Sequence, residues 1–158
     1  MQISFQGQPI KSFGGWSADW LAERLQDVSV QRLEIAVAWV KRSGLSRVRD
    51  GLVAFRKRGG KTSAIVGIDE GGATVQGLEL ALQLIDDVRV YHVLGRRTFH
   101  PKVYFASGVS SAHLLVGSNN LTAGGLFLVK PSRQSWVGFL VALGVCLALV
   151  GIMVLLLS

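Results

Sequence analysis

The amino-acid sequence predicts an α/β fold, a layered sheet with flanking helices, followed by one C-terminal transmembrane helix. Before residue 128, segments with the alternating pattern of strands take turns with segments that have the apolar spacing of helices. The 22 residues from Trp136 to Leu157 carry no charge, and as a helix they would extend ~33 Å, enough to cross a hydrocarbon core of ~30 Å. The sequence therefore divides into a domain over 1–128, a basic juxtamembrane linker over 129–135 and a transmembrane helix over 136–157.

Three elements are expected before residue 40. Alternation over residues 3–5 predicts a short strand, and Ser17 is a suitable N-cap for a helix that continues through Leu25. Apolar residues then occupy every second position from Leu33 to Trp39, which indicates a strand. Three tryptophans fall at apolar positions of these patterns and are expected in the core: Trp16, Trp20 and Trp39.

The middle of the domain predicts a helix, a strand and a second helix. Apolar residues recur at helical spacing from Leu45 to Phe55, and Gly59-Gly60 ends that helix. A short apolar strand covers residues 62–68, and Thr74 then opens a helix whose apolar face comprises Leu78, Leu82 and Ile85. Four cations gather after the first of these helices, where positive charge complements the helix dipole and no ligand is required: Arg56, Lys57, Arg58 and Lys61.

The last part of the domain predicts three closely spaced strands, of which the final two or three are antiparallel. They cover residues 88–93, 102–106 and 112–116, and a basic turn, Gly95-Arg96-Arg97, separates the first from the second. His92 and His113 have no motif around them and are expected to be ordinary strand residues.

The charge of the chain is concentrated in the predicted domain. All 17 Lys and Arg and all 10 Asp and Glu precede residue 134, so the net charge of +7 lies outside the apolar run. A basic domain attracts polyanions, which leaves nucleic acid and anionic lipid headgroups as two classes of partner.

The terminal segments predict an orientation in the membrane. The first ten residues lack the basic and apolar regions of a signal peptide. Lys130 and Arg133 precede the apolar run, so the positive-inside rule places residues 1–133 on the cytoplasmic side of a single-pass membrane protein. The single cysteine, Cys146, lies within the run, which excludes an intramolecular disulfide.

The candidate catalytic residues lie on two neighbouring strands. His100 and Lys102 are two residues apart and project from the same face of a strand. A neutral imidazole can attack phosphorus or protonate a leaving oxygen, and a lysine stabilises charge on the non-bridging oxygens. The next strand ends in Gly117, which permits close backbone approach, and Ser118 and Asn120 follow as neutral donors. Together these residues can hold and attack a phosphodiester.

At these residues the sequence resembles the phospholipase D superfamily, whose motif runs H-x-K-x4-D-x6-G-S-x-N. Five residues match that motif: His100, Lys102, Gly117, Ser118 and Asn120. The runs FHPKVYF and VGSNNLTAGGL, with AIVGIDEGGAT upstream, look like the branch that contains metal-independent restriction endonucleases and related nucleases. The resemblance covers residues 33–128, so the domain is expected to have the layered fold of that superfamily.

The resemblance implies a phosphohistidine mechanism in a homodimer, with no metal and no cofactor. His100 would be the nucleophile in one subunit and the general acid in its partner, because the chain carries one copy of the motif. Lys102 and Asn120 would hold phosphate oxygens, with Ser118 beside them. Four further residues are expected to contact the substrate, two of which, the arginines, also fit an ordinary solvated turn: Arg96, Arg97, Asn119 and Thr122.

The sequence departs from the family pattern at two places. The family's aspartate, five residues after Lys102, is Ser107, and no acid follows Gly125, where relatives carry an Asn-x-Glu whose glutamate supports the active site. The favoured hypothesis is a membrane-anchored nuclease that needs no metal. The alternatives are a phospholipase or phosphatidyltransferase that acts on membrane lipids, and a catalytically silent membrane protein that binds nucleic acid.

Overall fold

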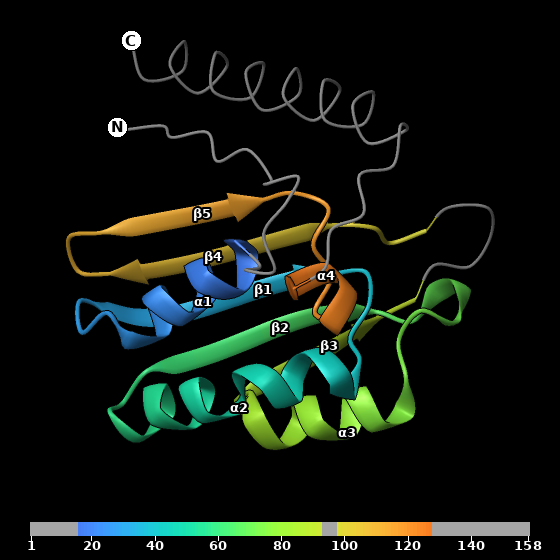
Figure 1. Cartoon of the computed structure of the whole chain (residues 1–158), viewed down its shortest axis with the longest axis horizontal. Helices are drawn as coiled ribbons and strands as arrows, with labels where there is room; N and C mark the ends of the chain where they lie inside the picture. Colours follow the sequence, from blue (N-terminus) through green and yellow to red (C-terminus); the bar gives the residue numbers. More distant parts are fainter. Residues whose placement is uncertain (1–15, 93–97, 128–158) are drawn as a thin grey trace, which may run out of the picture.

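The computed structural model describes residues 16–92 and 98–127 (Figure 1). Four expectations fall outside these residues: the strand at 3–5, the turn Gly95-Arg96-Arg97, the linker at 129–135 and the transmembrane helix at 136–157. Among the helices of the described part, none has the length and apolar character needed to cross a bilayer.

A five-stranded mixed sheet forms the centre of the domain. Its strands are β1 (Val30–Val37), β2 (Lys61–Gly67), β3 (Asp87–Tyr91), β4 (Lys102–Gly108) and β5 (Ala112–Val116), in the spatial order β3-β2-β1-β4-β5. β2 is parallel to both β1 and β3, and β4 is antiparallel to both β1 and β5. The predicted α/β sheet with flanking helices is therefore confirmed.

Only the last two strands form the expected antiparallel pair. β3 is parallel to β2, because the helix between them carries the chain back along the sheet before β3 begins. The three strands β1, β2 and β3 consequently end on the same edge of the sheet, which is also the edge where β4 begins.

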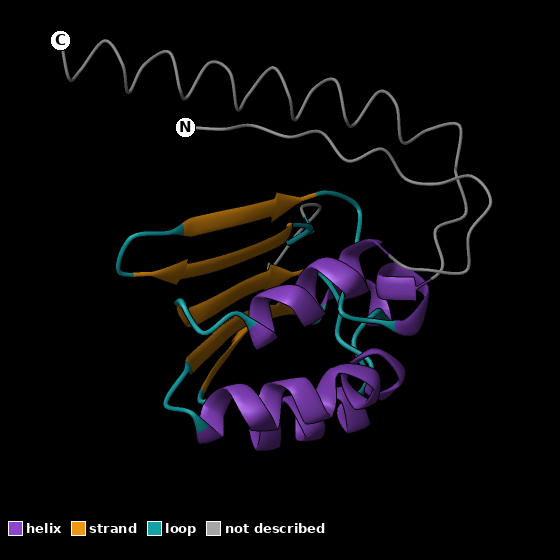
Figure 2. Ribbon diagram, turned by 60° about the vertical axis from the view of Figure 1, so that its left-hand side comes forward, coloured by secondary structure: helices purple, strands orange, loops and turns teal. Residues whose placement is uncertain are grey.

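The helices that the structure describes all lie on one face of the sheet (Figures 1 and 2). They are α1 (Trp16–Gln26), α2 (Arg42–Lys57), α3 (Val75–Leu84) and α4 (Ala123–Phe127), with a 3-10 turn η1 (Asp69–Gly71) between β2 and α3. The core lies between this layer and the sheet. Its strand residues alternate as the sequence predicts, and they include Leu33, Ile35, Val37, Ala64 and Val66.

α2 confirms its predicted apolar face. Leu45, Val48, Leu52 and Phe55 are all buried, and the left-handed Gly59, with φ of 92°, ends the helical segment as expected. Arg58 lies over the Phe55 ring and donates to three backbone carbonyls, those of Leu25, Asp27 and Val30. The guanidinium of Arg58 therefore has a structural role within the domain.

The predicted N-terminus of the first helix is wrong. α1 begins at Trp16, so Ser17 lies inside the helix, where its side chain is buried. A serine that precedes a helical apolar pattern is typical of an N-cap. The spacing of nearby residues could not predict that Ser17 would be buried inside the helix.

The predicted apolar face of α3 is also wrong in part. Thr74 does cap this helix, since its Oγ1 accepts a hydrogen bond from the Gly77 N–H at 3.1 Å. Ile85 is buried and Leu78 packs against the core as predicted, but Leu82 is 66% exposed. The buried positions within the helix are Gly77, Ala81 and Leu84. A Cβ on Gly77 would lie 2.6 Å from the Val40 carbonyl oxygen, so close packing selects small residues on this face.

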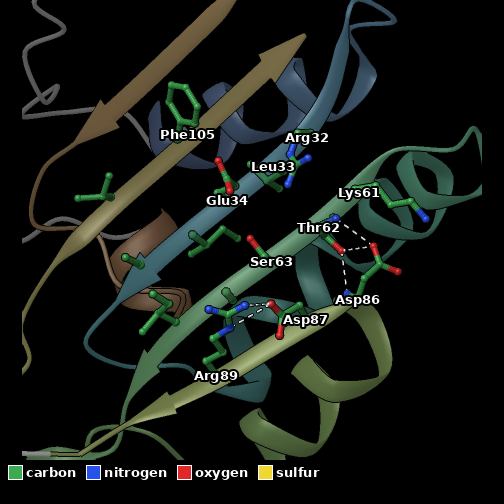
Figure 3. Close-up of a pocket in the computed structure, with 15 residues that line it drawn as sticks. Arg32, Leu33, Glu34, Lys61, Thr62, Ser63, Asp86, Asp87, Arg89 and Phe105 are labelled. Carbon is green, nitrogen blue, oxygen red and sulfur yellow. Dashed lines mark hydrogen bonds and ion pairs between the residues drawn. The ribbon is translucent and has the colours of Figure 1, made fainter.

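The other face of the sheet carries a hollow of about 520 Å³ (Figure 3). Three cations and three carboxylates line it, namely Arg32, Lys61, Arg89, Glu34, Asp86 and Asp87. Two of these, Asp87 and Arg89, form an ion pair at 2.9 Å. One of the three cations, Arg89, is therefore neutralised by a carboxylate of the same hollow.

Asp86 joins three elements of the domain. Its carboxylate accepts hydrogen bonds from the N–H and the hydroxyl of Thr62, both at 2.9 Å, and it pairs with Arg56 at 2.8 Å. Burial raises the pKa of Asp86, but the hydrogen bonds from Thr62 and Arg56 outweigh that effect, so the pKa lies below the usual 3.8. The network ties the end of α2 to the starts of β2 and β3.

Asp86→Asn is expected to lower the free energy of unfolding by about 1–3 kcal/mol at pH 7, because the charge-assisted bonds are lost. The carboxylate's contribution is fully present above the unfolded-state pKa of 3.8 and is lost as the pH falls through the lower folded-state value. Denaturant unfolding of wild type and variant should therefore give a gap that closes at low pH. Asp87→Asn, which removes an exposed pair, is the control with little effect. A pH-independent gap for Asp86→Asn would contradict this account.

Candidate active site

The two halves of the sequence motif meet at one end of the sheet, where β4 begins and β5 ends. The Gly117 N–H donates to the Lys102 carbonyl at 3.2 Å, which fixes the end of β5 beside the start of β4. On the other side, the Ala38 N–H donates to the Pro101 carbonyl at 2.9 Å. The backbone around His100 is therefore held between β1 and β5.

The side chains of His100 and Lys102 are in direct contact. Lys102 Nζ lies 2.6 Å from Nδ1 and 2.9 Å from Nε2 of the imidazole, and it donates to the His100 carbonyl at 3.2 Å. A neutral imidazole has one acceptor nitrogen, so the tautomer decides which of the two accepts the ammonium proton. Lys102 is buried at 8% exposure, whereas His100 is exposed at the surface.

The surroundings of His100 favour its neutral form. Partial burial lowers the pKa of His100 below 6.5, and the Lys102 ammonium lowers it further, while the carboxylate of Glu70 acts in the opposite direction. Burial also lowers the pKa of Lys102 from its usual value. At neutral pH the site thus presents an unprotonated imidazole beside a cation, which is the combination that nucleophilic attack on a phosphodiester requires.

Tyr104 fixes the second half of the motif through a hydrogen bond on the helix-covered face of the sheet. Like Lys102, it points to the helix-covered face of β4, where it pairs with Ile35 across the sheet. Its buried hydroxyl donates to the Asn119 carbonyl at 3.0 Å. Burial raises the pKa of Tyr104 far above its usual value, so this hydroxyl keeps its proton as a donor.

Asn120 is held by the chain that leaves β1. Its side-chain oxygen accepts a hydrogen bond from the backbone N–H of Trp39 at 3.1 Å, which identifies the NH2 group as the donor end of the amide. The Trp39 indole in turn packs edge-on against the His100 imidazole, with 5.8 Å between ring centroids. Trp39 therefore connects the two motif halves.

The same segment is anchored to the start of α2. Leu121 donates to the Trp39 carbonyl at 3.1 Å and accepts from the Lys41 N–H at 3.1 Å, and it forms a parallel bridge with Val40. A Cβ on Gly44 would lie 2.6 Å from the Leu121 carbonyl oxygen. The approach of α2 to this loop is thus as close as a glycine allows.

The remaining predicted site residues occupy different surroundings. Ser118 is exposed at the end of β5, and Asn119 is buried at 5% exposure. Thr122 Oγ1 accepts a hydrogen bond from the Gly125 N–H at 2.9 Å. Arg96 and Arg97 lie outside the described residues, and the substrate contacts expected of all these residues stay predictions. No three His, Cys, Asp or Glu side chains within 16–92 and 98–127 gather as a metal site would require.

Two residues near His100 were missed by the sequence patterns. Trp39 was expected in the core because it continues the alternation of β1, but it follows the strand's end and packs against the imidazole. Glu70 lies in the turn after β2 and acts on His100 electrostatically. Neither spacing nor composition marked these two, although both flank strand ends at the edge where the motif lies.

Two solved structures are examples of those that this chain resembles. The polyphosphate kinase from Porphyromonas gingivalis is 17% identical, with a TM-score of 0.48 over 68% of this chain and 18% of the kinase. NucT from Helicobacter pylori is 14% identical, with a TM-score of 0.48 over 70% of each chain. No protein-family model and no curated protein sequence matches. At these values the likenesses do not assign a function, which is argued below from this chain's own residues.

Two adjacent glycines of α4 provide a test of how tightly Asn120 is held. A Cβ on Gly125 would lie 2.2 Å from the Asn120 carbonyl oxygen, whereas nothing lies within 4 Å of a Cβ on Gly124. Gly125→Ala is therefore expected to displace Asn120 and to lower the free energy of unfolding by about 1–3 kcal/mol. Gly124→Ala is the matched control, expected to be neutral or stabilising by up to ~1 kcal/mol.

Denaturant unfolding of the two variants and the wild type makes this comparison. Equal stabilities for Gly125→Ala and Gly124→Ala would contradict the packing described here.

Proposed function

We propose that this chain is a phosphodiesterase of the phospholipase D type that cleaves nucleic acid without a metal. The observation that carries the proposal is the contact of the Lys102 ammonium with the His100 imidazole, beside an Asn120 amide fixed through Trp39. A nucleophile, a cation and an amide donor thus lie at one end of the sheet. These are the groups that phosphoryl transfer through a phosphohistidine needs.

In the proposed reaction, a nitrogen of the His100 imidazole bonds to phosphorus as the bond between phosphorus and the leaving oxygen breaks. Lys102 and the Asn120 amide stabilise the non-bridging oxygens, on which charge develops. A general acid protonates the leaving oxygen. Water then attacks phosphorus, the phosphorus–nitrogen bond breaks, and the imidazole is regenerated.

The general acid in this proposal is His100 of a second copy of the chain. The motif occurs once in the sequence, and His92 and His113 contact Asp69 and Arg24 rather than the site. The exposed position of His100 leaves room for a partner at the end of the sheet. The phosphate between two imidazoles would favour protonation of the one that acts as acid.

Nucleic acid is the proposed substrate because the chain is basic and a polyanion is drawn to it. In the sequence, Arg96 and Arg97 stand four and three residues before His100, a separation suited to contacts with the substrate backbone. Asn119, Ser118 and Thr122 belong to the same proposed contact surface.

Cleavage in the presence of EDTA tests the mechanism. The whole chain, solubilised in mild detergent, is expected to cleave labelled DNA or RNA with excess EDTA, and His100→Ala to lose at least ~100-fold in rate. An acid-labile phosphate on His100 should be trapped during turnover.

Four outcomes would decide against this mechanism. Equal cleavage by wild type and His100→Ala, or an absolute need for Mg²⁺, would contradict it directly. Release of phosphatidate from liposomes that depends on His100 would favour the lipid enzyme instead. Binding with steep salt dependence and no turnover by any preparation would favour the catalytically silent protein.

The apolar run at 136–157 is proposed to anchor the domain in a membrane, with the domain on the cytoplasmic side. A charge at the centre of such a helix costs about 2.5–3.5 kcal/mol, but little at its end. Leu147→Arg is therefore expected to reduce flotation of the chain with liposomes, whereas Leu157→Arg should leave it unchanged. Equal flotation of both variants would contradict the anchor.

A further inference from the structure

The turn η1 is bonded to the segment that leads into His100. Thr98 Oγ1 donates to Glu70 Oε1 at 2.9 Å, and the Phe99 N–H donates to Asp69 Oδ2 at 3.2 Å. The other carboxylate oxygen of Asp69 lies 2.6 Å from His92 Nδ1, just after β3. Two adjacent carboxylates of the turn thus hold the two residues that immediately precede the candidate nucleophile.

Glu70 occupies this place at a conformational cost. Its φ of 58° is in the left-handed region, and it is the only non-glycine residue of the described part with a positive φ. That conformation costs a residue other than glycine roughly 1–2 kcal/mol. The next residue, Gly71, has a similar φ of 63° without this cost, because it is a glycine. A glycine at position 70 would likewise adopt the observed backbone with less strain. The side chain of Glu70 therefore has a use that offsets this cost.

Two charged side chains have opposite effects on the pKa of the His100 imidazole. The Lys102 ammonium touches the ring and disfavours its protonation, while the Glu70 carboxylate favours protonation. The third neighbour described above, Trp39, presents an uncharged indole edge. The effect of Glu70 on the pKa of His100 is smaller than those of burial and of Lys102.

We propose that Glu70 is a positioning residue that orients His100 through its hydrogen bond to Thr98 and holds a negative charge on the same side of the candidate site. The inference rests on the proposed phosphohistidine function. It assigns Glu70 as the acidic residue beside the site, where the sequence has no Asp or Glu after Gly125. Glu70 favours the imidazolium that the partner copy needs as general acid. Lys102 favours the neutral imidazole that attacks.

Two substitutions separate the charge of Glu70 from its hydrogen bond. Glu70→Gln removes the charge but keeps an oxygen that accepts from Thr98. Thr98→Val removes the donor and keeps the charge. Glu79→Gln, at an exposed position of α3, is the matched control for the loss of one acid. Lys102→Met should move the pKa of His100 upward and calibrates the measurement in the opposite direction.

The pKa of His100 is measured by NMR titration of the whole chain labelled at its three histidines, with assignment by single substitutions. Glu70→Gln is expected to lower the pKa of His100, and Glu79→Gln to leave it unchanged. An unchanged pKa in Glu70→Gln would overturn the inference, whether or not the protein cleaves nucleic acid. If the pKa shifts but no preparation turns over, the proposed function fails while the electrostatic role of Glu70 stands.

The pH profile of cleavage distinguishes an electrostatic role from a structural one. Because a lower pKa leaves more neutral imidazole in acid, the acid limb of kcat/KM should move to lower pH in Glu70→Gln. Thr98→Val should instead lose activity on the order of 10- to 100-fold across the profile, since a misplaced nucleophile reacts slowly at every pH. A uniform loss in Glu70→Gln, with the acid limb unmoved, would overturn the electrostatic part.

Discussion

The close packing of the chain after β5 against the corner between β1 and α2 positions the whole candidate site. Leu121 exchanges backbone hydrogen bonds with Trp39 and Lys41, and the Asn120 amide accepts from the same Trp39. Glycines at positions 44 and 125 make this approach possible, because a Cβ at either would lie within 2.6 Å of backbone atoms of the loop. Backbone contacts therefore fix the position of this loop and permit little adjustment. The side chains of the motif residues in the loop are positioned as a result.

Around this frame, the chemistry depends on a balance of charges at one imidazole. Partial burial of His100 lowers the pKa of its imidazole, and the Lys102 ammonium, which touches the ring, lowers it further, so the neutral form is favoured. The opposing carboxylate comes from a turn after β2, at a different strand end. Since β1 and β2 are parallel and β4 antiparallel to β1, the ends of β1 and β2 and the start of β4 share one edge. Groups far apart in the chain are thereby collected around a single histidine.

The fold explains which charges are available for a substrate. Arg56 pairs with Asp86, Arg58 binds three carbonyls, and Arg89 on the open face of the sheet pairs with Asp87. These side chains support the domain itself, so they are poor candidates for a polyanion. A nucleic acid that reaches His100 would instead meet the motif edge of the sheet, where Lys102 and Asn120 lie. In the proposed nuclease, the net positive charge of the chain attracts the nucleic acid, and the residues at this edge bind it.

Much of this protein was decided by local sequence. The alternation of β1, the helical spacing of α2 and the Thr74 cap predicted their elements, because periodicity and capping depend on neighbours within a few residues. The spacing of His100 and Lys102 predicted a shared face of one strand. Their side chains are indeed in contact, but His100 precedes β4, which begins at Lys102. Only the tertiary structure decided that β3 is parallel to β2 and that Gly77 and Ala81 lie on the buried face of α3. It also decided that Trp39 packs against the His100 ring and that the Glu70 carboxylate favours protonation of that ring. Those outcomes depend on contacts between segments distant in the chain, and a single sequence carries no periodic signal for a contact of that kind.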